Sequence, residues 1–387
     1  MLGIVQSEIR NFKMSLEIRE VTTKADLQTF IYLPEKIHKD HKNWVPPIYL
    51  DDREYFNAKK NKSFTYSDTI LLLAWKGKEA AGRIMGIIVR PYNELHKEKH
   101  VRFSWMETEN DPEVFSALMK AVEEWGRQKG MTHIVGPLGF SDKDPQGFLV
   151  EGYEEPVVIA SNCNFPYMVE LTEKFGFSPK ENLVVYKIPV PAEQPAIIAR
   201  IEERYKQRDS GLKVVEFTSR RAVKPYIHRA LGLVNQTFTE IYGFWPYTEK
   251  EMDDFANRFL YLINPRYIKL VINRNEEAVA FVVAMSDIGE GIRKARGRLI
   301  PFGWIHVLRA SRRSNQLNLL LGAVRSDYQG RGLDMLMGSK LLESARKTGK
   351  TVMDSHLELE QNVKVRAEME RNGGKVYKRF RIYIKAL

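Results

Sequence analysis

The sequence predicts an α/β fold in which one unit of mixed strands and helices occurs twice along the chain. In each half the expected order is strand, helix, three strands, helix, strand, helix and strand. A proline-bearing break separates the halves, where Pro189, Pro191 and Pro195 precede a charged run. The 387 residues, 43% hydrophobic and 28% charged, suit two or three globular domains. One large mixed α/β domain is the alternative interpretation.

The first half contains alternating strand and helix signals. Asp111 and Pro112 begin a helix as N-cap and first helical residue, and an apolar stripe with helical spacing follows to Gly130. Polar loops are expected at 51–67 and at 136–147, and we expect the second loop to face the cleft of the second unit. The expected strands and helices are strands 16–21, 69–76, 80–89, 101–107, 132–135 and 183–188, and helices 24–38, 112–130 and 167–175.

The second half repeats this order. A long basic loop is expected at 287–314. We therefore predict an N-terminal unit at 1–190, a linker at 191–212 and a C-terminal unit at 213–387. The expected strands and helices are strands 213–217, 267–272, 278–285, 316–324, 352–359 and 376–385, and helices 222–240, 249–259, 331–347 and 362–371.

Composition excludes several classes of protein. No apolar run approaches the ~20 residues of a membrane-spanning helix, and the N-terminus shows no secretion signal. A single cysteine, Cys163, favours a reducing cytoplasm. Sixty Lys and Arg against 49 Asp and Glu give a net charge of +11, which favours anionic partners. No zinc or EF-hand spacing is present, so we expect no metal, with His38 and His41 at the surface.

The sharpest local pattern is a glycine-rich junction between an apolar strand and an amphipathic helix. Gly330 and Gly332 stand where the helix begins, and Gln329 and Arg331 add hydrogen-bond donors. The first turn of a helix has unpaired amides and a positive dipole end, and glycine lets an anion approach them. A phosphate-binding site is therefore predicted. A flexible turn without a ligand is the alternative.

At this junction the sequence resembles the GNAT (GCN5-related N-acetyltransferase) superfamily, whose pyrophosphate motif is Gln/Arg-x-x-Gly-x-Gly/Ala. Here Gln329 and Gly332 match, and Asp334 stands at the third fixed position. The resemblance implies two GNAT-like units, each a mostly antiparallel mixed sheet flanked by helices. It also implies acyl-CoA as cosubstrate, with the pantetheine near Ala323 and Val324 and the pyrophosphate on residues 329–332. The first unit has METENDPE at the corresponding place, and so lacks this loop.

A second feature of the superfamily is an Asn that opens the helix after strand five, followed by a Tyr that protonates the CoA thiolate. Asn362 occupies the first position, and the resemblance assigns it to the cofactor site. Met369 stands at the Tyr position. Tyr377 and Tyr383 on the final strand are the candidate substitutes, and both are equally explained as sheet aromatics.

Alternating ionisable residues at 353–360 provide candidates for a general base. On a strand, Asp354, His356, Glu358 and Glu360 would share one face. Beside a cofactor loop, such a group can adjust the pKa of a base toward neutrality. We predict His356, Glu358 and Glu360 as catalytic residues. A solvated strand face is the alternative.

Two stretches bear on the acceptor and the partners. The resemblance places the loop 241–247 at the acceptor site, where aromatic side chains favour an apolar or long-chain acceptor. The basic stretch 291–313 holds seven Lys and Arg, no acidic residue, and Phe302, Trp304 and Leu308. It suits CoA phosphates, anionic lipid or RNA, or is simply a solvated loop. The predicted acceptor-site residues are Tyr242, Phe244, Trp245 and Tyr247.

The leading functional hypothesis is acyl transfer from acyl-CoA to a primary amine. The tandem pattern is similar to GNAT-type bacterial ceramide synthases, which implies a long-chain or sphingoid amine as acceptor. Two alternatives remain: a catalytically inactive acyl-CoA-binding or regulatory protein, and a peptidyl transferase that uses aminoacyl-tRNA. We expect a small-molecule or lipid partner rather than nucleic acid. A cytoplasmic location, with peripheral contact to an anionic inner membrane surface, fits these expectations.

Overall fold

The structure is a computed structural model that describes residues 15–193, 200, 203 and 211–387. Most of the predicted linker, including the charged run at 198–208 apart from residues 200 and 203, lies outside the described residues. The first half alternates strands with helices in the expected order. Its elements are β1 (Leu16–Glu20), α1 (Lys24–Ile37), α2 (Tyr49–Tyr55), α3 (Ser63–Tyr66), β2 (Ser67–Lys76), β3 (Glu79–Val89), α4 (Arg90–His96), β4 (His100–Thr108), α5 (Pro112–Gln128), β5 (His133–Gly136), β6 (Phe148–Glu151), α6 (Pro166–Lys174) and β7 (Ser178–Pro189).

The second half follows the same order with short additional turns. Helix 222–240 is divided into α8, η1 and α9, because Pro225 interrupts it. The elements of this half are β8 (Lys213–Glu216), α8 (Arg220–Val223), η1 (Lys224–Tyr226), α9 (Ile227–Thr237), α10 (Glu249–Phe259), η2 (Pro265–Tyr267), β9 (Ile268–Ile272), β10 (Ala278–Ser286), α11 (Gly289–Lys294), α12 (Gly303–Arg313), β11 (Gln316–Val324), η3 (Ser326–Tyr328), α13 (Leu333–Lys347), β12 (Val352–Asp354), β13 (Glu358–Leu359), α14 (Val363–Arg371) and β14 (Lys375–Ala386).

Two segments expected to be loops contain helices. The polar segment 51–67 carries most of α2 and all of α3. The basic segment 287–314 forms α11 and α12, because Ile292, Val307 and Ala310 provide it with a buried apolar face. In both segments the charged residues stand out in the composition, so the short apolar face is not recognised from composition alone.

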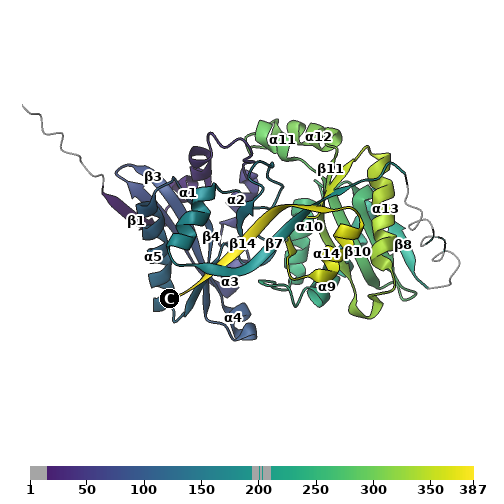
Figure 1. Cartoon of the computed structure of the whole chain (residues 1–387), viewed down its shortest axis with the longest axis horizontal. Coiled ribbons are helices and arrows are strands. Elements are labelled where there is room, and N and C mark those ends of the chain that lie inside the picture. The colour runs from purple at the N-terminus through teal and green to yellow at the C-terminus, as the bar shows by residue number, and fades with distance from the viewer. Residues whose placement is uncertain (1–14, 194–199, 201–202, 204–210) are drawn as a thin grey trace, which may run out of the picture.

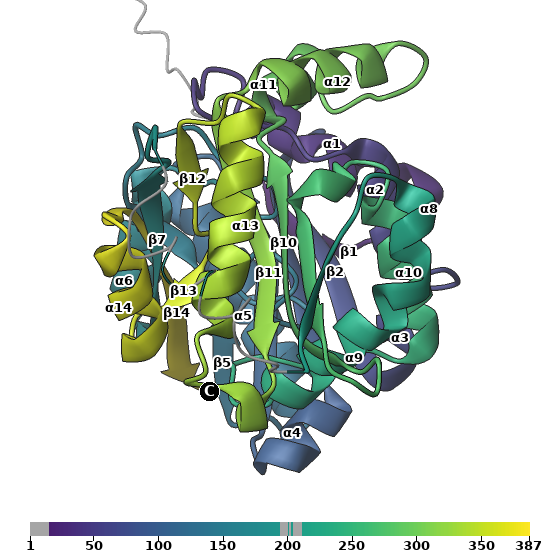
Figure 2. The same cartoon turned by 90° about the vertical axis from the view of Figure 1, so that its right-hand side faces the viewer.

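One continuous sheet of 14 strands runs through both halves. Along its main path the order is β1-β2-β3-β4-β5-β14-β7-β12-β11-β10-β9-β8. Within the part of the chain that the structure describes, only the pairs β4–β5 and β11–β12 are parallel, as the prediction of a mostly antiparallel sheet requires. Helix α5 covers the first-half strands, while α13 lies along β9 and β10 (Figures 1 and 2).

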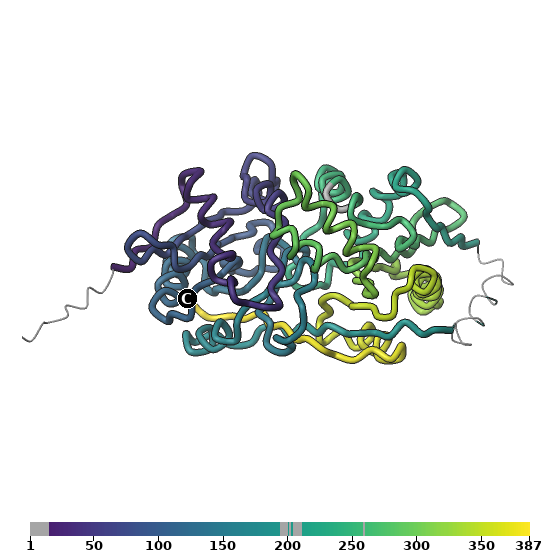
Figure 3. Tube along the Cα trace, turned by 90° about the horizontal axis from the view of Figure 1, so that it is seen from above, coloured from purple at the N-terminus to yellow at the C-terminus, as the bar shows by residue number. Residues whose placement is uncertain are grey.

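The last strand of each half pairs within the other half. Strand β14 pairs with β5 through Tyr383–Gly136 and neighbouring residues, and β7 pairs with β12 through Ile188–Met353. The two strands also pair with each other over most of their length, so they cross the middle of the molecule together (Figures 1 and 3). The division into units 1–190 and 213–387 remains a prediction. In the structure, the last strand of each unit pairs with strands of the other unit.

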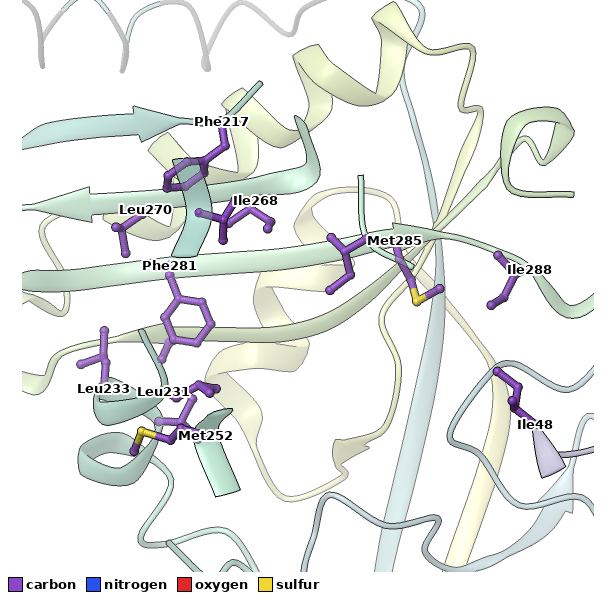
Figure 4. Close-up of a cluster of buried hydrophobic side chains, with 14 of the residues drawn as sticks. Ile48, Phe217, Leu231, Leu233, Met252, Ile268, Leu270, Phe281, Met285 and Ile288 are labelled. Carbon is purple, nitrogen blue, oxygen red and sulfur yellow. The ribbon is translucent and has the colours of Figure 1, made fainter. Parts of the chain in front are cut away.

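The apolar cores meet across the junction of the halves. Ile48 of the first half belongs to the same buried cluster as Met285, Ile288 and Phe281 of the second (Figure 4). The halves therefore share buried apolar surface in addition to strand pairing.

Candidate functional site

A cavity of about 2940 Å³ is lined by both halves of the molecule. The first half contributes Trp105, Lys143 and the segment 157–163 to its wall, and the second half contributes β11 and the start of α13. A cavity of this size exceeds the ~300–1,000 Å³ of a typical small-ligand pocket. It has room for a large cosubstrate and an acceptor together.

The cavity opens where β11 and β12 diverge. The two strands pair only between 316–318 and 352–354, although β11 continues to Val324 with β10 on its other side. A bulge at Leu320 displaces β11 at the same place, since Val283 pairs with Leu321 and Ala284 with Leu319. Residues 319–324 all line the cavity, among them the predicted pantetheine contacts Ala323 and Val324. One edge of β11 is therefore available to a ligand that lies between the two strands.

The glycine loop lies at the end of this gap. Gly330 has φ 72° and no neighbour within 4 Å of a Cβ built on it, and Gly332 is the left-handed N-cap of α13. No described side chain caps the helix, and the first backbone hydrogen bond along it runs from Leu336 N–H to the Gly332 carbonyl at 3.0 Å. The amides of the first turn therefore have no acceptor within the helix. Such a terminus attracts anions through these amides and the helix dipole.

The predicted residues of the glycine loop do not all line the cavity. Gln329 and Gly330 line the cavity, as does Asp334, whereas Arg331 stacks on Tyr328 with its guanidinium carbon 4.7 Å from the ring centre. Asn362 caps α14, accepting from the Val365 amide at 3.4 Å, and lines the cavity opposite α13. The structure thus gathers most of the predicted cofactor residues around one opening.

The carboxyl groups of Asp334, Glu358 and Glu368 line the cavity near this loop. Burial, followed by the nearby charge of Glu368, raises the pKa of Glu358 to about 8. Burial, followed by the charge of Asp334, raises the pKa of Glu368 to about 7. Just below neutral pH Glu358 is therefore largely protonated and Glu368 is partly protonated, which limits their repulsion of a bound phosphate. Perturbed carboxyls in a cavity are typical of proton-transfer sites.

His356 lies on the same wall but not on a continuous strand. Its φ of 61° is left-handed, and the chain has no strand between β12 and β13, so the expected shared face of four ionisable residues is interrupted. Its amide donates to Asp354 Oδ1 at 2.8 Å, and its Nε2 lies 3.2 Å from the Ile159 carbonyl, the acceptor of its N–H. The lone pair is thereby assigned to Nδ1. Burial lowers the pKa of His356, which keeps the ring neutral.

Three other candidates are held outside the cavity wall. Glu360 is ion-paired with Arg379. Tyr377 donates its hydroxyl to Asp354. Tyr383 is fully buried in the first-half core, where its hydroxyl donates to Glu173 at 3.0 Å. The structure does not bring Glu360, Tyr377 or Tyr383 to the carboxyl groups beside the glycine loop.

The aromatic loop between α9 and α10 contributes two of its four candidate residues to the cavity. Trp245 and Tyr247 line it, whereas Phe244 is buried in the core and Tyr242 packs against the hydrophobic cluster of β14 and β7. Lys143 of the first-half loop binds this segment: its Nζ donates to the Trp245 carbonyl at 2.5 Å and lies 4.1 Å from the Tyr247 ring centre. The expectation that loop 136–147 faces the second unit's cleft is confirmed.

A separate cluster joins His38, His41 and Cys163. Their candidate ligand atoms lie within 4.8 Å of one another, and the two Nδ1 atoms are 2.9 Å apart. His38 is buried, so the expectation that it lies at the surface was wrong, because its ring packs against Trp44 and Phe165. The expectation that the protein needs no metal stays a prediction.

Reasoning from sequence missed Glu368, Lys143 and Ile159. Glu368 lies on a helix with no fully buried residue, and its half-buried carboxyl loses contact with water where α14 faces the start of α13 across the cavity. Lys143 and Ile159 belong to the first half and reach the site across the junction. No local pattern distinguishes these residues from ordinary surface positions.

Comparison with known proteins supports the fold. The chain is 28% identical over 383 residues to the bacterial ceramide synthase of Caulobacter vibrioides, covering 96% of this chain and 98% of that protein. It is 26% identical over 382 residues to Protein YghO of Escherichia coli, covering 96% and 95%. No family model matches.

Among solved structures, the chain resembles a tandem GNAT protein from the clavulanic acid biosynthesis pathway. The TM-score is 0.58 at 11% identity, and the match covers 96% of this chain and 98% of that one. The two structures match over nearly their whole length, and the match therefore includes both halves of this chain. The molecule therefore has the tandem GNAT fold.

Proposed function

We propose that this protein is an N-acyltransferase that moves an acyl group from acyl-CoA to a long-chain primary amine. The observation that carries the proposal is the opening between β11 and β12, which joins the uncapped start of α13 to a cavity lined by His356, Glu358 and Glu368. In this arrangement the amides of the first turn of α13 bind the CoA pyrophosphate. The free edge of β11 at 319–324 binds the pantetheine arm.

Glu358 is proposed as the general base. The amine nitrogen attacks the thioester carbonyl carbon, a C–N bond forms, and the C–S bond breaks. Glu358 in its ionised form accepts the proton that the nitrogen loses, and His356 Nδ1 orients the amine by accepting a hydrogen bond. A base with a pKa of about 8 is well suited to this step near neutral or mildly alkaline pH.

Glu368 is proposed as the general acid that replaces the missing Tyr. It is on α14, one residue before Met369, which occupies the Tyr position of the superfamily. With a pKa of about 7 it is still partly protonated near neutral pH. A thiol has a pKa of about 8.5, so proton transfer from Glu368 to the departing thiolate is favourable.

The choice of a long-chain amine as acceptor rests on the cavity wall and on one relative. Trp245, Leu320 and Leu357 give much of the wall an apolar character, and the cavity is large enough for an extended chain. The relative from Caulobacter vibrioides is named a bacterial ceramide synthase, which supports an amine that carries a long hydrocarbon chain.

Thiol release measured with purified protein tests the proposal. Long-chain acyl-CoA and sphinganine should together release free CoA and form an N-acyl product detectable by mass spectrometry. Spermidine in place of sphinganine should give little product. Thermal stabilisation by CoA without turnover on any amine would instead identify an acyl-CoA-binding protein and contradict the assignment of catalysis.

A further inference from the structure

The helical hairpin α11–α12 exposes apolar side chains that no described part of the chain covers. Ile300, Phe302, Trp304 and Leu308 are 74%, 70%, 50% and 42% exposed. Trp304 and Leu308 lie four residues apart on α12, and therefore on one face of the helix. Figure 2 shows this hairpin projecting from the edge of the molecule. Several large apolar side chains grouped in this way indicate an interaction surface.

The same hairpin is strongly basic. Residues 291–313 contain seven Lys and Arg and no acidic residue. Arg309, Arg312 and Arg313 are exposed; Arg313 interacts with the charge of Glu290, whereas no ion pair among the described residues involves Arg309 or Arg312. Arg312 continues the line of Trp304 and Leu308 at the next turn of α12. Apolar and cationic groups on one helix face match the interfacial region of an anionic bilayer, where aromatic rings enter the headgroup layer and arginines bind phosphates.

The hairpin lies next to the mouth of the cavity. The Tyr49 amide donates to the Gly297 carbonyl at 3.1 Å, which fixes the hairpin turn to the start of α2. Ile292 of α11 and Leu50 of α2 both line the cavity, and Leu50 is exposed. Ile292 and Leu50 therefore connect the hairpin to the wall of the cavity.

We propose that the α11–α12 hairpin docks the protein on an anionic lipid bilayer, from which a long-chain substrate enters the cavity past Leu50. The choice of substrate rests on the proposed function, whereas docking does not and is measured without turnover. Charge complementarity favours a bilayer that contains phosphatidylglycerol over a neutral one. The exposed aliphatic side chains of Ile300 and Leu308 favour a bilayer over RNA, because aromatic rings can stack on bases whereas aliphatic side chains have no ring to stack.

Co-sedimentation of the full chain with vesicles tests the proposal. Binding to phosphatidylcholine vesicles containing phosphatidylglycerol should be strong, and binding to phosphatidylcholine alone should be weak. Phe302→Ser should reduce binding to the anionic vesicles by about tenfold, because it removes a ring from the bilayer interface. Leu95→Ser is the matched control: Leu95 is 67% exposed on α4, and its loss should leave binding unchanged.

The charge contribution is tested with a second pair of variants. Arg309→Gln combined with Arg312→Gln should reduce binding by about 25-fold, at about fivefold for each arginine. Lys78→Gln combined with Lys120→Gln makes the same change in net charge elsewhere on the surface and should have little effect. All four sites are exposed, so circular dichroism and melting temperature should match the parent protein.

Two results would overturn the proposal. One is equal vesicle binding by the parent, Phe302→Ser and the arginine variant. The other is binding to single-stranded RNA that the arginine variant weakens, with no binding to anionic vesicles. Loss of acyl transfer with vesicle binding intact would count against the proposed function alone.

Discussion

At the residue scale, the carboxyl of Glu358 is the group on which proton transfer depends. Because its pKa is raised to about 8, the fraction able to accept a proton grows as the pH rises toward that value. We expect kcat/KM to increase as Glu358 ionises and to fall again as the general acid Glu368, with a pKa of about 7, loses its proton, so the pH profile is bell-shaped. Glu358→Gln should lower kcat by about 100-fold or more and abolish this rise.

The measurement is CoA release from mildly acidic to alkaline pH, with Glu124→Gln on the surface of α5 as the control. A pH profile of Glu358→Gln that kept the shape of the parent profile would contradict this role.

The Glu358 carboxyl should also affect stability: the ionisation that supports activity should lower the free energy of unfolding. Its pKa is raised in the folded state, so the native protein holds the proton more tightly than the unfolded chain does, and the free energy of unfolding falls as the pH rises from about 4.5 to about 8. Glu358→Gln should therefore be more stable than the parent by about 1–3 kcal/mol above this range, and about equal below it. Urea unfolding at acidic and alkaline pH measures the difference. A constant difference at every pH would show that packing, not ionisation, is responsible.

At the element scale, the start of α13 is the feature on which cofactor binding depends. Gly330→Ala should raise the KM for acyl-CoA by about tenfold or more, because a Cβ would stand between the ligand and the helix amides. The structural cost should be small, about 1 kcal/mol, since no atom lies within 4 Å of the added carbon and only the φ of 72° is unfavourable.

Gly349 offers a closely matched control. It has φ 71°, also with no neighbour within 4 Å, at the opposite end of α13. Gly349→Ala should cost the same stability and leave the KM unchanged. Steady-state kinetics and melting curves of both variants separate the two effects, and an equal rise in KM for both would show that the loop has no special role in binding.

The elements also show how far sequence reasoning reaches here. Strand β11, helix α10 and the Asn362 cap lie where the hydrophobic periods and capping residues predicted them. These features are local, so a sequence records them directly. The interrupted strand at His356 was not predicted, because an alternating pattern does not reveal that one residue adopts a left-handed backbone. The burial of Glu368 was missed for a different reason: it depends on where two helices meet.

At the scale of the whole molecule, the exchange of the final strands makes the halves dependent on each other. Phe380, Ile382 and Tyr383 of β14 are buried where β14 pairs with strands of the first half, and Ile188 of β7 is buried beside β12 of the second. Local hydrophobic pattern cannot predict this, because a strand with two apolar faces is equally compatible with a neighbour from either half. Each half alone would lack a central strand and expose the edge of its sheet.

We therefore expect neither half to fold by itself. Fragments 1–193 and 211–387, produced separately, should be unfolded or aggregated, since each leaves β5 or β12 without its exchanged neighbour. Produced together in one cell, they should associate, co-purify and melt in one cooperative transition. Phe380→Ala in the second fragment should weaken this association, because Phe380 is buried between β7 and β6. Either fragment alone giving a sharp melting transition would contradict the interdependence, and would mean that the strand exchange joins two domains each stable without it.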